Sequence, residues 1–253
     1  MIYDALIIIG SICAAILFLV VATRTYDAPK RKEANDFTGA VVAVIGTTYA
    51  VILAFVLSNV WGLFREAKAN EEKEANALVN VWRLAEQVPQ PAAKEIRAAC
   101  VKYAEDAINK DWPAMAAYQL LPPESHENVD WLWKLVGQSQ SHSGDNSIAI
   151  SQMVEELRLL TQYRRIRIMH SQEAVPDILK AVLLAGGVIT VAAACLFGVP
   201  SFQFHVLQVG ALSFLISLVL VAVADIDRPY QGPVRVEPNG FMFSLRTFAR
   251  HPD

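Results

Sequence analysis

Four long runs of apolar residues dominate the pattern of hydrophobic and polar positions along the chain: 5–23, 39–64, 178–199 and 205–224. Each run is long enough to cross a bilayer as a helix, because about 20 residues span the roughly 30 Å hydrocarbon core. Helices and closed barrels are the structures that satisfy backbone polar groups in lipid, and the alternating pattern of barrel strands is absent from the sequence. The pattern therefore predicts an all-α membrane protein with four transmembrane helices, paired in the hairpins 1–64 and 178–224.

The first apolar run has a second interpretation as a signal peptide, which is also N-terminal and uncharged. No basic residue precedes this run, and no convincing small-residue cleavage site follows it. We therefore interpret residues 5–23 as a true membrane span.

Residues 65–177, between the two hairpins, predict a soluble helical domain. Glutamate and lysine alternate after the second run without a break, and an apolar stripe at helical spacing follows from Leu78 to Ala85. Pro89, Pro91 and the polar stretch 137–147 separate further helices. The first and last helices of the domain are expected to continue spans two and three. Such a charged helix needs neighbours for stability, and an intrachain bundle or a stalk of copies around a symmetry axis would both supply them.

Four spans place the N-terminus, the domain 65–177 and the tail 225–253 on one side of the membrane. The positive-inside rule gives conflicting indications of which side this is. Basic residues in the connection 24–38 favour a cytoplasmic connection, whereas those before span three and after span four favour a cytoplasmic domain. We expect the soluble domain and both termini to lie in the cytoplasm.

Composition and motifs argue against several functions. The chain is 54% hydrophobic and 19% charged with a net charge of −3, so nucleic acid is not an expected partner. The sequence contains no zinc-protease, hydrolase, phosphate-loop or dinucleotide-binding motif, and its three cysteines do not pair at metal-ligand spacing. Gly186, Gly187 and Gly210 predict close contacts between membrane helices. We therefore expect no enzyme activity, no cofactor and no metal site.

One face of span two carries a mixed polar and aromatic stripe, at Thr48, Phe55, Asn59, Gly62 and Glu66. The stripe is compatible with a packing seam, since threonine and asparagine hydrogen-bond between membrane helices and glycine permits close approach. The geometry of the stripe favours this seam over the alternative of a pore wall, in which Phe55 constricts the path and Asn59 and Glu66 contact ions. A polar residue deep in lipid is costly, so Asn59 is expected to face protein or water.

Charged residues of opposite sign flank the predicted domain. Glutamates follow span two, among them Glu71 and Glu74, and the arginines Arg164, Arg165 and Arg167 precede span three. Arg164 and Arg167 share a helix face, whereas Arg165 lies about 100° around it. We expect pairing between the glutamates and the arginines. Binding of the arginines to lipid phosphate, or a vestibule in which one set of charges enriches ions, are the alternatives.

Asp227, Arg228 and Pro229 directly follow the fourth apolar run. Charges at the end of a span anchor it at the membrane interface, and proline stops the helix. We predict that these residues anchor span four while the tail 233–250 packs on the domain. A simple stop signal followed by a loose tail is the alternative.

Three segments give the chain a resemblance to a known family. They are AFVLSNVWGLFREAKANEEKEANALVNVWRLAEQVP, QYRRIRIMHSQEAVPDILKAVLLAGGVIT and DIDRPYQGPVRVEP. With their spacing, residues 45–250 resemble the bacterial bestrophin-like membrane proteins. The resemblance implies a pentameric anion channel of the bacterial inner membrane, with four spans per subunit, span two lining the pore and a cytoplasmic domain between spans two and three. The acidic calcium ligands of true bestrophins are absent, so calcium gating is not expected.

The leading hypothesis is therefore a homo-oligomeric ion channel with span two at its axis, whose partners are the lipid bilayer, inorganic ions and further copies of the chain. A non-conducting helical membrane scaffold or regulatory protein is the alternative.

Overall fold

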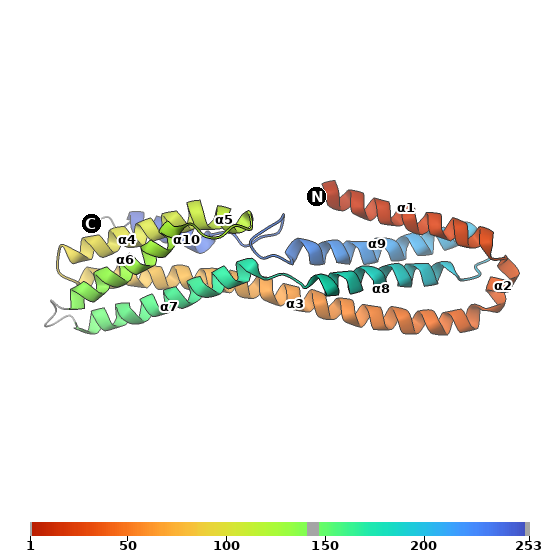
Figure 1. Ribbon diagram of the computed structural model, residues 1–253, viewed down its shortest axis with the longest axis horizontal. Coiled ribbons are helices and arrows are strands. Elements are labelled where there is room, and N and C mark those ends of the chain that lie inside the picture. The colour runs from red at the N-terminus through yellow and green to blue at the C-terminus, as the bar shows by residue number, and fades with distance from the viewer. Residues whose placement is uncertain (1, 141–146, 251–253) are drawn as a thin grey trace. The chain divides into compact units, whose positions relative to one another are not determined.

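The computed structural model describes residues 2–140 and 147–250, and every regular element within them is helical (Figure 1). The predicted all-α class is thereby confirmed. Four helices are long and apolar enough to cross a membrane, namely α1 (Ile2–Thr25), α3 (Asn35–Leu84), α8 (Asp177–Cys195) and α9 (Phe202–Ile226). The chain forms two compact units, the first comprising residues 1–61 and 174–227 and the second residues 62–173 and 228–253.

In the first unit, α1 and α8 both pack against α9, and the short helix α2 (Ala28–Glu33) follows α1. One face of α3 contributes Tyr49, Leu53, Val56 and Val60 to an apolar cluster with residues of α8 and α9. These positions are spaced by four, three and four residues, so they lie along one side of the helix. The packing therefore uses one stripe of α3 and leaves its opposite side outside the cluster.

Gly186 on α8 permits the close approach of α3. A Cβ atom at this position would lie 2.5 Å from Cδ2 of the Tyr49 ring, so the expected helix contact is confirmed here. The same expectation for Gly210 is wrong within this chain, because a Cβ atom there would have no neighbour within 4 Å. Helix α9 turns Val209 and Ser213 inward instead.

Two connections between membrane helices are joined by polar contacts in the first unit. Asn35 Nδ2 donates to the carbonyl oxygen of Gly198 at 3.1 Å, and the Gly198 N–H donates back to Asn35 Oδ1 at 2.8 Å. Arg31 Nη1 donates to the carbonyl oxygen of Phe197 at 3.1 Å. A Cβ atom at Gly198 would collide with backbone atoms of Lys32. The residue at this position must therefore lack a side chain.

We expect Gly198→Ala to destabilise the purified protein by about 1–3 kcal/mol, because the added methyl forces the two connections apart. Thermal unfolding followed by tryptophan fluorescence measures the loss. Gly10→Ala is the matched control, since it adds the same methyl group where a Cβ atom has no neighbour within 4 Å. Equal melting temperatures for the two variants would contradict the prediction.

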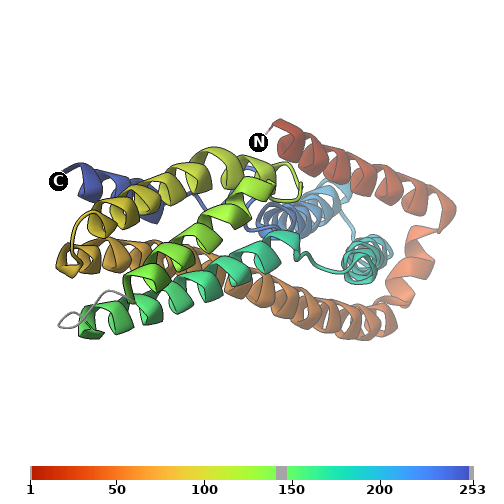
Figure 2. The same cartoon turned by 60° about the vertical axis from the view of Figure 1, so that its left-hand side comes forward.

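The second unit contains the remainder of α3 and the helices that surround it. These are the 3₁₀ turn η1 (Ala85–Gln87), α4 (Ala92–Asp106), the π-helical turn η2 (Ala107–Asp111), α5 (Trp112–Ala116), α6 (Pro123–Gln140), α7 (Ser147–Gln172) and α10 (Asn239–Arg250). Figure 2 shows α4, α6 and α7 running alongside this part of α3. The helices break at Pro89 and Pro91 as predicted. Of the predicted loop 137–147, residues 141–146 lie outside the described residues.

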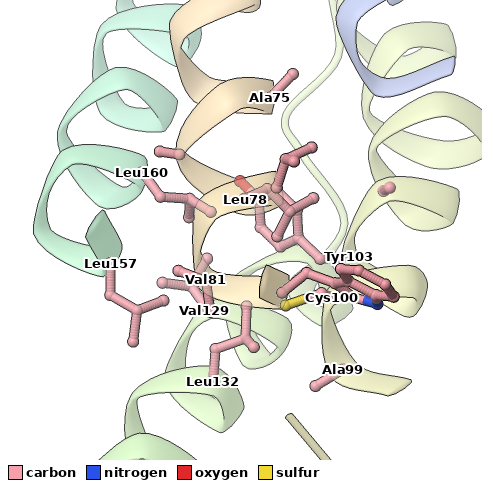
Figure 3. Packing of buried hydrophobic residues seen from close by; sticks show 14 of the residues in the cluster. Ala75, Leu78, Val81, Ala99, Cys100, Tyr103, Val129, Leu132, Leu157 and Leu160 are labelled. Carbon is pink, nitrogen blue, oxygen red and sulfur yellow. The ribbon is translucent and has the colours of Figure 1, made fainter. Parts of the chain in front are cut away.

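Figure 3 shows part of the apolar core of the second unit, with side chains from α3, α4, α6 and α7. Labelled members are Ala75, Leu78 and Val81 from α3, Ala99, Cys100 and Tyr103 from α4, Val129 and Leu132 from α6, and Leu157 and Leu160 from α7. Burying one leucine side chain contributes about 1.5–3 kcal/mol. The chain itself thus supplies the neighbours that the charged part of α3 requires, as the intrachain alternative predicted.

Candidate functional site

The stripe predicted on span two lies on the side of α3 that the first unit leaves uncovered. Thr48, Phe55 and Asn59 are exposed, with 70% of Phe55 accessible. About 100° around the same helix, Tyr49 and Val56 are buried against the apolar cluster. These three residues of the stripe therefore do not form a packing seam within this chain. Their side chains are open to the surroundings of the protein.

The stripe's last two positions belong to the second unit. Gly62 is half-buried and a Cβ atom there would have no neighbour within 4 Å, and Glu66 is exposed. The next turns of α3 differ, because Asn70, Glu71 and Glu74 are buried. The acidic run that follows the apolar segment is thus split between surface and interior.

A buried ion cluster occupies the interior of the second unit. Arg167 of α7 is fully buried, and its Nε and Nη2 donate to the two carboxylate oxygens of Glu74 at 2.8 and 2.9 Å. Nη2 also donates to Asp111 Oδ2 at 3.1 Å. The Tyr103 hydroxyl donates to Glu74 Oε1 at 2.6 Å. The cluster joins α3, α4, η2 and α7 through charge-assisted hydrogen bonds, which are about twice as strong as neutral ones.

Aromatic rings enclose the guanidinium group of Arg167. Its Cζ lies 4.9 Å from the centre of the Trp112 ring and 6.0 Å from that of Phe241. Burial alone would lower the pKa of Arg167, but Glu74 and Asp111 outweigh it and hold that pKa well above its usual range. The arginine therefore stays charged in the interior, which makes the cluster an element of structure.

The other predicted ion-pair residues have different partners. Glu71 Oε1 accepts the N–H groups of Gly240 and Phe241. Arg164 is buried and its Nη2 donates to Ser125 Oγ at 2.9 Å. Arg165 is exposed. The structure thus brings Glu74 and Arg167 together, and it separates the remaining members of the predicted set.

Asp227 connects the end of α9 to the beginning of α8. Its buried carboxylate accepts the Val175 N–H at 2.6 Å and pairs with Lys180 Nζ at 2.7 Å. These contacts lie within the first unit. Asp227 therefore fixes two membrane helices to each other, a role that its position after span four did not indicate.

Arg228 and Pro229 begin the tail within the second unit. Arg228 Nη1 donates to Gln231 Oε1 at 3.1 Å, and its guanidinium lies 4.7 Å from the centre of the Tyr118 ring. The carbonyl oxygen of Pro229 accepts the Val236 N–H at 2.7 Å. Both residues therefore hold the turn that opens the tail.

The tail contributes to the core of the second unit. Tyr230, Val236, Phe241 and Phe248 are all buried there. The prediction that the tail packs on the domain is confirmed for the same chain, and the loose-tail alternative is wrong.

An apolar cavity of about 420 Å³ lies among α1, α8 and α9 in the first unit. Ser11 and Ser217 on its wall hydrogen-bond to each other. Among the described residues, no group of three histidine, cysteine, aspartate or glutamate side chains is arranged to hold a metal ion. The cavity offers no ionisable group for catalysis.

Comparisons with known proteins agree on one family. The family model described as the Bestrophin-like domain matches residues 9–241. Among solved structures, a bacterial bestrophin homologue from Klebsiella pneumoniae is 15% identical, covers 97% of this chain and 100% of its own, and superposes with a TM-score of 0.72. A single-substitution variant of a bacterial bestrophin homologue from that organism is 14% identical, with coverage of 96% and 98% and a TM-score of 0.76. No curated protein matches the sequence.

Proposed function

Because the chain belongs to the bestrophin-like family, we propose that it forms a homo-oligomeric ion channel in which the apolar part of α3 lines the pore. Family membership supports ion transport as the general activity in place of catalysis. The structural likeness, at 14–15% identity, supports the fold.

The observation that carries the proposal is the uncovered face of α3. Asn59 is exposed on a helix that is apolar enough to cross a membrane. An amide that faces hydrocarbon without a partner is costly, so this side chain requires protein or water beside it. Copies of the chain arranged around an axis would turn the uncovered face inward and place Asn59 in a hydrated path.

Phe55 and Thr48 then acquire distinct roles in the proposed pore. Phe55 lies one helical turn from Asn59 and is 70% exposed, so a ring of such side chains would form an apolar constriction. Apolar constrictions gate ion flow by excluding water. Thr48 lies seven residues before Phe55 on the same face and would offer hydroxyl groups to the path beyond the constriction.

Charged residues near the mouth set the preference for ions in this proposal. Glu66 is exposed on the same helix, and a ring of carboxylates there would enrich cations. Arg165 is also exposed, and its positive charge would enrich anions instead. Glu71, Glu74, Arg164 and Arg167 are buried, so we assign them to the architecture of the second unit and not to an ion-contacting vestibule.

We place the protein in the bacterial inner membrane as a multi-pass oligomer, a pentamer by the family resemblance. The second unit carries its own apolar core, which supports its assignment as the soluble cytoplasmic domain. Asp227 is proposed to hold the end of span four near the membrane interface through Lys180, with Arg228 and Pro229 directing the tail toward that domain.

Reconstitution of the purified protein into liposomes tests the proposed function. We expect ion flux above that of protein-free liposomes, together with a stable oligomer by native mass spectrometry. Reversal potentials under a salt gradient then identify the permeant charge. A stable oligomer that carries no ion over a range of pH and calcium concentration would instead support the non-conducting scaffold.

A further inference from the structure

The N-terminus of α10 meets a buried carboxylate from another helix. Glu71 lies on α3 beyond the end of the apolar run at Phe64, within the second unit, and only 1% of it is exposed. Its Oε1 accepts the backbone N–H of Gly240 at 2.7 Å and that of Phe241 at 3.3 Å. The first N–H groups of a helix have no partner within the helix itself, so Glu71 satisfies two of them.

The contact continues along both helices. A Cβ atom at Gly240 would lie 2.8 Å from Cβ of Ala75, so only glycine fits there. Further along, the ring of Phe248 stacks on Trp82 with 5.1 Å between the ring centres. Helix α10 thus docks on α3 through a specific surface, with Glu71 at one end and the aromatic pair at the other.

Burial, and to a smaller extent the neighbouring acids, favour the neutral form of Glu71. Glu72 and Glu74 lie on its own helix, and Tyr230 approaches from the tail. Arg167 of α7 is engaged by Glu74 and by Asp111 of η2, and Tyr103 of α4 donates to Glu74. Burial is the largest cause of the raised pKa of Glu71. The N–H groups of Gly240 and Phe241 lower this pKa, whereas Glu74 and Glu72 raise it further. The pKa that results is about 7.

We propose that the docking of α10 on α3 is a pH-sensitive latch controlled by protonation of the Glu71 carboxyl group. The neutral carboxyl fits the buried site, whereas the carboxylate must give up its hydration and lie beside Glu72 and Glu74. When α10 undocks, water reaches Glu71 and the charged form is no longer penalised. The latch is a property of the second unit and stands independently of the proposed channel activity.

The direction of the pH dependence follows from the two protonation equilibria. Undocked Glu71 in water has the ordinary pKa of about 4.5, and docked Glu71 has a pKa of about 7. The docked state therefore binds its proton more tightly. Docking is strongest below about pH 4.5, weakens as pH rises, and levels off above about pH 7. Between pH 5 and pH 7 the docking equilibrium constant falls roughly 40-fold.

Hydrogen exchange of the full-length protein in detergent micelles tests the latch. Glu71→Gln is neutral at every pH, and its side-chain oxygen still accepts the Gly240 N–H. Comparing the two proteins at the same pH cancels the intrinsic pH dependence of amide exchange. We expect the protection of the α10 peptide in the wild type, divided by that in Glu71→Gln, to fall by more than tenfold from pH 5 to pH 7.

Two controls keep the outcome decisive. Glu72→Gln removes the exposed charge that contributes least to the raised pKa of Glu71, so this variant is expected to keep most of the wild-type pH response. If Glu71→Gln fails to fold, the α6 peptide of the wild type serves as the reference for exchange chemistry. Protection of α10 that does not change with pH relative to this reference, or that rises with pH, would overturn the proposal. An equal pH response of α10 protection in Glu71→Gln and in the wild type would also overturn the proposal.

Discussion

Arg167→Met is expected to destabilise the protein by about 3–5 kcal/mol, because it leaves two carboxylates in the interior without a cation. Glu74 and Asp111 both accept hydrogen bonds from this guanidinium, and all three side chains are buried. Methionine fills much of the same volume without the charge. Most single domains are stable by 5–15 kcal/mol, so the loss would remove a large share of the second unit's stability. The free energy of unfolding by denaturant, determined in micelles for both proteins, measures this loss of stability.

The same helix provides a matched control. Arg158 on α7 is exposed and donates to both carboxylate oxygens of Glu155. Ion pairs at the surface contribute little, because water screens the charges and the side chains lose freedom. Arg158→Met should therefore unfold close to the wild type.

Equal losses in Arg167→Met and Arg158→Met at neutral pH would show that the buried cluster is not a main source of stability.

The sequence predicts the fold well where neighbours along the chain determine the structure. The four apolar runs correspond to α1, α3, α8 and α9 because bilayer length and helical hydrogen bonding leave few alternatives. Pro89 ends the second long helix because it lacks an N–H donor. Gly186 marks a close helix contact because a side chain there would collide with the Tyr49 ring.

The site was less predictable because its contacts join residues far apart in the sequence. The Arg167–Glu74 pair could be suspected from charge, since two oppositely charged helices were expected to be adjacent. The contacts of Asp111 and Lys180 could not be predicted, because nothing near these residues in the sequence indicates their partners. Glu71 was expected to pair with arginine, but the tail placed the N-terminus of α10 against it. The contact between Glu71 and α10 depends on Gly240, which lies 169 positions from Glu71 in the sequence.

Phe55→Ala is expected to raise ion flux through the reconstituted protein tenfold or more, which corresponds to lowering the barrier to conduction by about 1.4 kcal/mol. The reason is the position of the side chain in the proposed pore. Phe55 is 70% exposed on the face of α3 that its own chain leaves uncovered. A ring of these side chains would exclude water from the path, and truncation to alanine would allow water and ions to pass.

Phe214→Ala provides the matched control for this variant. Phe214 lies on α9, another membrane helix, and is 46% exposed. Its truncation removes the same group of atoms from a helix that is not assigned to the pore, so flux should remain within about twofold of the wild type. Native mass spectrometry must show the same oligomer for all three proteins. If the oligomer is intact and Phe55→Ala conducts no better than Phe214→Ala, Phe55 does not constrict a pore, and its uncovered face is left to contacts with lipid or with a neighbouring copy.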